Sequence, residues 1–211
     1  GGIASVAGMA GALNWMPRAE TLQQLRQAAE HLQAIDADSH YTYMARSFIA
    51  YLTDDWPAYL LVSSTMAERF SSHPSGHIGR ALSQAAFGRF DDCIVDAERA
   101  ARVGPLDYNA AVARFVVGVC HYMRGDAAEA ARHARSAHQA NPRLPSPPLM
   151  LAAALAQTGR EDEARAIVAE YTSRNPDFRA EHIARLLRGQ DPRYLAGRDR
   201  IVQTLHALGM P

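Results

Sequence analysis

The sequence predicts an all-α fold, a right-handed superhelical solenoid of antiparallel helix hairpins with about 10 to 12 helices. The first observation is a pattern that occurs twice between residues 118 and 176, with paired positions 34 residues apart. The second is that small residues recur at fixed positions in both copies, with a Gly at the turn. The third is an Asn-Pro pair that closes each copy. A repeat of this length is typical of stacked helical hairpins.

Each repeated position has a physical role in a hairpin. The turn Gly provides the left-handed cap that ends the first helix, and the closing Pro stops the second. Small residues are needed where the two helices cross closely, so Ala130 is expected to face Gly118. The matched pairs are Gly118 and Ala152, Gly125 and Gly159, Ala130 and Ala164, and Pro142 and Pro176.

The helices before this region are expected in a weaker form of the same pattern. Pro17 suits a helix start, and Ser39 and Asp55 are candidate N-caps for the next two helices. Asp36-Ala37 lacks the closing Pro, so the first unit departs from the repeat pattern. The expected helices in order span residues 17–35, 39–52, 55–70, 76–87, 90–103, 107–123, 127–140, 146–158 and 161–174.

The chain divides into three expected parts. Residues 1–16 form an uncharged N-terminal segment that is a candidate to pack on the array. Residues 17–176 form the repeats, with the clearest units at about 76–105, 107–142 and 146–176. Residues 177–211 form C-terminal capping helices, with a short helix at 179–188, a break at 190–192 and an amphipathic helix at 197–208. We expect this last helix to cover the open end of the solenoid.

Composition excludes several functions. The 22 basic and 22 acidic residues balance, which argues against binding nucleic acid through this domain. All 22 basic residues are Arg, so mechanisms that need a Lys amine are excluded. The two cysteines, Cys93 and Cys120, are too few for a disulfide framework and are expected to be buried, inert thiols. No run of residues is long and apolar enough to predict a membrane span.

The repeats resemble the tetratricopeptide family over about residues 40 to 176. The tail, with Asn175-Pro176-Asp177-Phe178, Glu181, Asp191-Pro192 and Gly209-Met210-Pro211, resembles the C-terminal end of certain bacterial regulatory chains. In those chains a class III adenylate cyclase domain or a winged-helix DNA-binding domain precedes a tetratricopeptide array. The resemblance implies a regulatory or sensory module, although no motif of either effector domain occurs in this sequence.

The first helix of each hairpin should line the inner face of the array, and the residues expected there are apolar. This predicts a groove for a partner protein or peptide, such as an apolar helix. The alternative is that the chain's own segment from Ile3 to Trp15 fills the groove, because large exposed apolar patches are rare. The candidate groove residues are Ile78, Leu82, Val112, Phe115, Val119, Tyr122 and Leu149.

We expect no catalytic residue, no cofactor and no metal site. His73 and His77 are separated by Pro74, and His121, His133 and His138 share a hairpin without an acidic partner at ligand spacing. The adjacent acidic pairs at helix starts are explained by capping.

The leading functional hypothesis is therefore a non-enzymatic protein–protein interaction scaffold within a larger bacterial signalling or transcription-regulating protein. One alternative is a small-molecule-binding or catalytic domain that uses the inner groove, and another is a self-association module that forms a homo-oligomer. The expected location is cytoplasmic, or periplasmic if a membrane span precedes this region in the parent chain.

Overall fold

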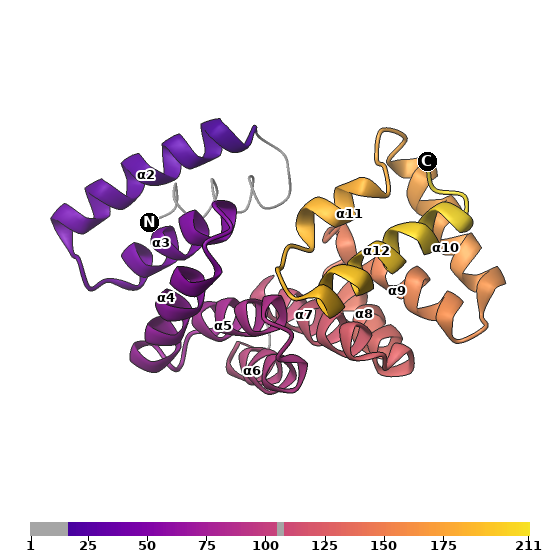
Figure 1. The fold of residues 1–211 in the computed structure, drawn as a ribbon, viewed down its shortest axis with the longest axis horizontal. Helices are drawn as coiled ribbons and strands as arrows, with labels where there is room; N and C mark the ends of the chain where they lie inside the picture. Colours follow the sequence, from indigo (N-terminus) through magenta and orange to yellow (C-terminus); the bar gives the residue numbers. More distant parts are fainter. Residues whose placement is uncertain (1–16, 105–107) are drawn as a thin grey trace.

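The computed structural model describes residues 17–104 and 108–211, and Figure 1 shows its fold. This part of the chain contains eleven helices and no strand, which confirms the predicted all-α class and the number of helices. The helices are α2 (Arg18–Ile35), α3 (His40–Leu52), α4 (Trp56–Arg69), α5 (Pro74–Ala86), α6 (Phe90–Val103), α7 (Tyr108–Arg124), α8 (Ala127–Ala140), α9 (Ser146–Gln157), α10 (Glu161–Arg174), α11 (Glu181–Leu186) and α12 (Pro192–Ala207).

Consecutive helices pack in pairs, and the pairs stack into a solenoid. The hairpins are α3–α4, α5–α6, α7–α8 and α9–α10, and α4, α6 and α8 also pack against the first helix of the following hairpin. Figure 1 shows the array curving from α2 and α3 through α5–α8 to α9 and α10. Because α5 also contacts α3 and α7, and α7 contacts α9, the first helices of the hairpins form one continuous inner layer.

The turns inside the hairpins share one backbone feature. Gly88, Gly125 and Gly159 have positive φ angles of 72°, 98° and 79°, the left-handed conformation that ends a helix without a side-chain clash. The α3–α4 turn has Asp54 at the corresponding place, with φ 59°, and Asp is among the few residues that tolerate it. The α3–α4 hairpin therefore keeps the turn geometry of the others with a different residue.

The predicted close approach of Gly118 and Ala130 is present. A Cβ on Gly118 would lie 3.2 Å from the carbonyl oxygen of Ala130, and Ala130 and Ala164 are fully buried. A still closer approach occurs between α4 and α5, where a Cβ on Gly76 would lie 2.5 Å from the backbone nitrogen of Ala67. These positions determine how near the helices of the array can lie to one another.

The C-terminal helix differs from the prediction in its start and its position. It begins at Pro192, not at residue 197. The Asp191 side chain accepts hydrogen bonds from the backbone N–H groups of Arg193 and Tyr194 at 2.9 and 3.4 Å, and Pro occupies the first helical position. The Asp-Pro pair therefore starts a helix rather than breaking the chain.

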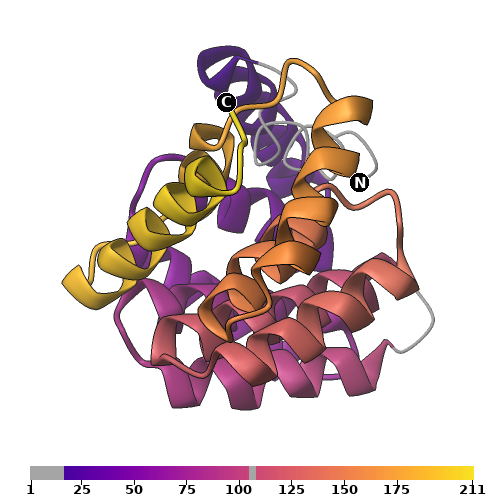
Figure 2. The same cartoon turned by 90° about the vertical axis from the view of Figure 1, so that its right-hand side faces the viewer.

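The position of α12 also corrects the expectation that it covers the open end beyond α10. It packs against α7 and α9, the inner helices of the last two hairpins. In Figure 2 α12 (yellow) lies beside the layer formed by the magenta and salmon helices, not beyond the end of the array. The short helix before it spans Glu181–Leu186, less than the 179–188 that was expected.

The two cysteines also differ from the prediction of inert thiols. The structure joins Cys93 of α6 and Cys120 of α7 in a disulfide, with Cα atoms 6.1 Å apart, a separation that suits bridged cysteines. Both are fully buried between neighbouring hairpins. Among the described helices, none is long and apolar enough to cross a membrane.

Candidate functional site

The inner face of the array contains a cavity of about 210 Å³ between α3, α5 and α7. None of the described side chains that line it is charged. The lining is mostly apolar, with Ser47, Ser75 and Ser146 as its small hydroxyl groups. The larger lining side chains are Met44, Phe48, Tyr51, Tyr59, Met66, Ile78, Leu82, Val112, Phe115, Val116, Leu144, Leu186 and Leu187.

Four of the seven predicted groove residues lie in the wall of this cavity. They are Ile78 and Leu82 from α5 and Val112 and Phe115 from α7. Residues on α5 and on α7 meet there because the two helices are the first members of adjacent hairpins and pack against each other. The structure thus brings together side chains 30 or more residues apart in the chain.

The other three predicted residues, Val119, Tyr122 and Leu149, are not in the cavity wall. All three are almost fully buried in the main hydrophobic core. The same core contains Ile201 and Leu205 of α12, which are also fully buried. The C-terminal helix packs against α7 and α9, the two helices that carry these three residues, so the structure leaves none of the three open to a partner.

Close contacts hold α12 on the inner face. A Cβ on Gly197 would lie 2.3 Å from the sulfur of Met123 on α7, so a glycine lets the two helices approach. Gln157 of α9 donates a hydrogen bond to the Tyr122 hydroxyl, and the Thr204 side chain of α12 lies near the same hydroxyl. Burial raises the pKa of Tyr122 to about 12.

The segment between α11 and α12 is also fixed to the repeats. The backbone N–H groups of Gln190 and Asp191 both donate to the carbonyl of Ala86, at 3.1 and 3.0 Å. Arg193 donates to the carbonyl of Gly88 at 2.8 Å. The C-terminal end of α5 and the turn after it thus accept three hydrogen bonds from a segment about 100 residues later.

A second set of contacts connects α11 to the first hairpin. The Tyr51 hydroxyl of α3 donates to the carbonyl of Leu186 at 2.7 Å. Asp54 accepts hydrogen bonds from Arg18, at 3.0 Å, and from Arg188. Since Leu186 and Leu187 line the cavity, the C-terminal segment forms one wall of it.

A histidine–serine pair lies beside the cavity. His40 of α3 has its Nε2 atom 2.7 Å from the hydroxyl of Ser75, and Nδ1 of His73 lies 3.0 Å from the same hydroxyl. Burial, and then the neighbouring His73, lowers the pKa of His40 to about 4. The Ser75 hydroxyl thus lies between two imidazoles, and Ser75 is one of the few polar residues of the cavity lining.

The walls that α3 and the C-terminal segment contribute were not predicted from the sequence. Met44, Phe48 and Tyr51 line the cavity from α3, although no groove residues were predicted on this helix. Their i, i+4 and i+7 spacing along one helix face was the signal that could have identified them. The segment from Ile3 to Trp15 lies outside the residues that the structure describes.

An array of stacked hairpins with an apolar inner face defines a helical-repeat fold of the tetratricopeptide type. Residues 121–196 match the family model described as tetratricopeptide repeat. No curated protein matches the chain.

Solved structures of the same type resemble most of the chain. A thermophilic TPR protein in Thermus thermophilus has a TM-score of 0.64 at 16% identity, and the match covers 90% of this chain and 91% of that one. YrrB, described as a TPR protein with an unusual peptide-binding site, has a TM-score of 0.56 at 16% identity, with 85% and 97% covered.

The APC/C hetero-tetramer Cut9–Hcn1 has a TM-score of 0.68 at 14% identity, and the match covers 89% of this chain. This chain spans only 37% of the length of that one. At these levels of identity, the likeness establishes the shared solenoid fold.

Proposed function

We propose that the chain is a non-enzymatic scaffold that binds a protein partner through its inner face. The partner's contact is an apolar segment, most simply an amphipathic helix, which places apolar side chains in the cavity between α3, α5 and α7. The observation that carries this proposal is the position of α12. This helix packs its apolar side chains onto α7 and α9, so the same inner layer already accepts an amphipathic helix within the chain.

The chemistry of the cavity supports an apolar occupant. Its described lining side chains are uncharged, and four of the seven predicted groove residues, Ile78, Leu82, Val112 and Phe115, belong to it. A void of about 150 Å³ lined by Leu, Ile and Phe side chains holds a benzene molecule. A cavity of about 210 Å³ therefore has room for one large apolar anchor, as in helix-in-groove recognition.

The proposal includes a biological setting. The resemblance of the tail to bacterial regulatory chains supports a role as the regulatory module of a larger signalling or transcription-regulating protein in the cytoplasm. The described residues provide no membrane-spanning helix. The same groove offers two alternatives, which are a small molecule in the cavity and a second copy of the chain.

Selection of displayed helical peptides against the full chain tests the proposal. We expect selected peptides to share apolar residues at i, i+3 or i+4 and i+7, and to bind by calorimetry in a 1:1 complex. Val112→Asp puts a charge in the cavity wall and should weaken binding at least tenfold. Val95→Asp on α6 is the matched control, because Val95 is 63% exposed outside the cavity, and its affinity should equal that of the wild type.

Three results would contradict the proposal. Peptides that bind equally well to Val112→Asp place the site elsewhere. Dimerisation that Val112→Asp abolishes assigns the groove to a second copy of the chain. Binding that appears only when residues 1–16 are deleted, with a loss of thermal stability, shows that the N-terminal segment is the normal occupant.

A further inference from the structure

A cluster of possible metal ligands lies beside the turn of the α7–α8 hairpin, outside the cavity. His121 of α7 and Glu129 and His133 of α8 each offer one donor atom, and these atoms all lie within 4.8 Å of one another. The two imidazole rings are stacked, with centroids 5.4 Å apart and planes 11° apart. Nε2 of His133 lies 3.7 Å from Oε2 of Glu129.

The fold explains why these three residues meet. Glu129 and His133 are four residues apart and therefore share one face of α8. The turn at Gly125 reverses the chain, which brings the end of α7 with His121 alongside that face. The expectation that the histidines have no acidic partner was wrong, because Glu129 precedes His133 by one helical turn.

The donor set suits a late first-row divalent cation. Two imidazoles and one carboxylate are a ligand combination found for three-coordinate protein sites that leave the fourth position of Zn²⁺ to solvent, and imidazole nitrogen also suits copper, nickel and iron. Ligand atoms about 2.0–2.1 Å from a tetrahedral ion are about 3.4 Å apart. The three donor atoms already lie within 4.8 Å of one another.

The surroundings of the cluster contain both a supporting group and a competing one. Oδ2 of Asp126 lies 3.3 Å from Nδ1 of His121, where a carboxylate can orient a ligating imidazole. Arg132 donates to Glu129, with its Nε 2.8 Å from Oε2, and its Nη2 lies 2.6 Å from Nε2 of His133. The Arg132 side chain is 62% exposed, so it is free to turn into solvent when a cation takes its place.

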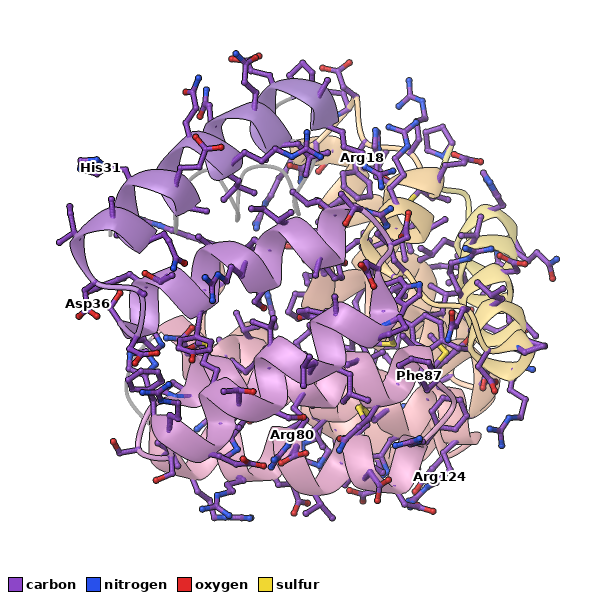
Figure 3. The ribbon with its side chains drawn as sticks, turned by 60° about the vertical axis from the view of Figure 1, so that its left-hand side comes forward. Arg18, His31, Asp36, Arg80, Phe87 and Arg124 are labelled. Atoms are coloured by element: carbon purple, nitrogen blue, oxygen red, sulfur yellow. A yellow bond between two sulfur atoms is a disulfide. The ribbon has the colours of Figure 1, made fainter. Side chains whose placement is uncertain are left out.

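Arg124 is the other cation beside the cluster. Its Nη2 lies 3.2 Å from Nδ1 of His121, and its Nη1 lies 2.8 Å from Oδ1 of Asp91 on α6. Figure 3 shows the labelled Arg124 at the surface of the molecule. Asp91 and Asp126 both form ion pairs with this side chain. Arg124 therefore keeps carboxylate partners when His121 binds a cation.

We propose that His121, Glu129 and His133 form a binding site for one late first-row divalent cation, with Zn²⁺ as the best fit. Bound there, the cation links α7 to α8 beside their turn and leaves one coordination position to solvent. The site is independent of the proposed peptide groove, because none of its three ligands lines the cavity.

Calorimetric titration of the full, metal-stripped chain with Zn²⁺ alone tests the site. We expect one ion per chain and a higher melting temperature in its presence. Loss of a group that only orients a metal ligand weakens metal binding by roughly 10–100-fold. We expect at least this loss of Zn²⁺ affinity from each of the ligand variants His121→Ala, His133→Ala and Glu129→Gln. Glu129 is at a partly exposed position, so Glu129→Gln provides a test in a variant that folds.

Two further variants distinguish this site from adventitious binding. Arg132→Met removes the cation that competes for Glu129 and His133, and it should tighten Zn²⁺ binding. His73→Ala is the matched control, since His73 and His40 form another close ring pair, with centroids 3.8 Å apart, outside the proposed ligand set. Its affinity should be that of the wild type.

Three results would overturn the proposal. The chain does not bind Zn²⁺, binding survives both His121→Ala and His133→Ala, or His73→Ala abolishes it. Circular dichroism of each variant confirms that a loss of binding is not a loss of fold. An Arg132→Met variant that binds Zn²⁺ more weakly than the wild type contradicts the assigned ligands as well.

Discussion

At the scale of single residues, Asp96 is the buried charge that connects two helices of the array. It lies on α6, 5% exposed, and accepts a hydrogen bond from Nε of Arg80 on α5 at 2.7 Å. Nδ1 of the buried His77 lies 3.7 Å from the same carboxylate. No sequence pattern indicated this pair, because Arg80 and Asp96 are 16 residues apart and nothing but the packing of α5 on α6 brings them together.

Removal of this carboxylate should strongly destabilise the fold. Asp96→Ala leaves Arg80 without its partner in a partly buried place, which costs about 3 kcal/mol of unfolding free energy. Asp91→Ala is the control, because its pair with Arg124 is exposed and is worth at most about 1 kcal/mol. Urea denaturation of both variants measures the difference, and equal losses would contradict a structural role for the Asp96 pair.

His40 makes the stability of the N-terminal repeats depend on pH. Its pKa is lowered to about 4, first by burial and then by His73, from about 6.5 in an unfolded chain. The unfolded state therefore binds more protons between these two values, and stability falls as the pH falls through this window. The groups that face it are His73, Ser75, Tyr41 and Phe70.

Denaturation at pH 7 and at pH 5 measures this effect. We expect the wild type to be less stable at pH 5, and His40→Gln to lose less of its stability than the wild type does over the same interval. If His40→Gln had the same pH dependence of stability as the wild type, the loss of stability would come from other histidines and the prediction would be wrong.

At the scale of elements, the repeat pattern predicted the hairpins well. The helices α8 and α10 have the bounds expected from the sequence, and α6 does as well. This success has a local cause: a turn glycine, a small residue at the crossing and a closing Pro each act within a few residues. The α3–α4 hairpin was harder to recognise as a repeat, because it lacks one of these local signals: Asp54 stands where the other hairpins have the turn glycine.

Overpacking of a hairpin crossing tests the assignment of its small residues. Ala130→Leu adds volume where α8 meets Gly118 of α7, with no space available, and should cost about 1–3 kcal/mol. Ala128→Leu on the less buried side of the same helix should change stability by less than about 0.5 kcal/mol. Equal melting temperatures for the two variants would show that Ala130 is not at a close crossing.

The docking of α12 is a second element-scale feature, and it could not be predicted from the repeat pattern. The amphipathic character of the helix was evident, with Ile201 and Leu205 on its apolar face, but its partners are α9 and α7, the latter about 80 residues earlier. A periodic pattern specifies contacts between neighbouring repeats and says nothing about where a terminal helix returns. Gly197 permits the close approach to Met123. A glycine in a helix can indicate such a contact, but the sequence does not show which helix makes it.

Truncation of one α12 side chain measures how much this docking contributes. Ile201→Ala should cost about 2–5 kcal/mol, because Ile201 is fully buried against the array. Gln203→Ala, exposed on the same helix, should cost less than about 0.5 kcal/mol. A small loss for Ile201→Ala would mean that α12 leaves the inner face in solution.

At the scale of the whole molecule, the solenoid creates an inner face and the C-terminal segment divides it. That face and four residues of the cavity could be predicted from the sequence, since periodicity shows which side of a helix faces a groove. The prediction that Val119, Tyr122 and Leu149 line the open groove was wrong, because all three are buried in the core that also contains Ile201 and Leu205 of α12. The apolar cavity between α3, α5 and α7 is the part of the inner face that the proposed partner uses.

Hydrogen–deuterium exchange of the full chain, with and without a selected apolar helical peptide, tests that claim most directly. Peptide binding in the cavity should increase protection in α3, α5 and the first half of α7, which supply its walls. Exchange in α6 and α8, which lie behind them in the hairpins, should change little. Protection centred on α6 and α8, with α5 and α7 unchanged, would contradict a binding site on the inner face.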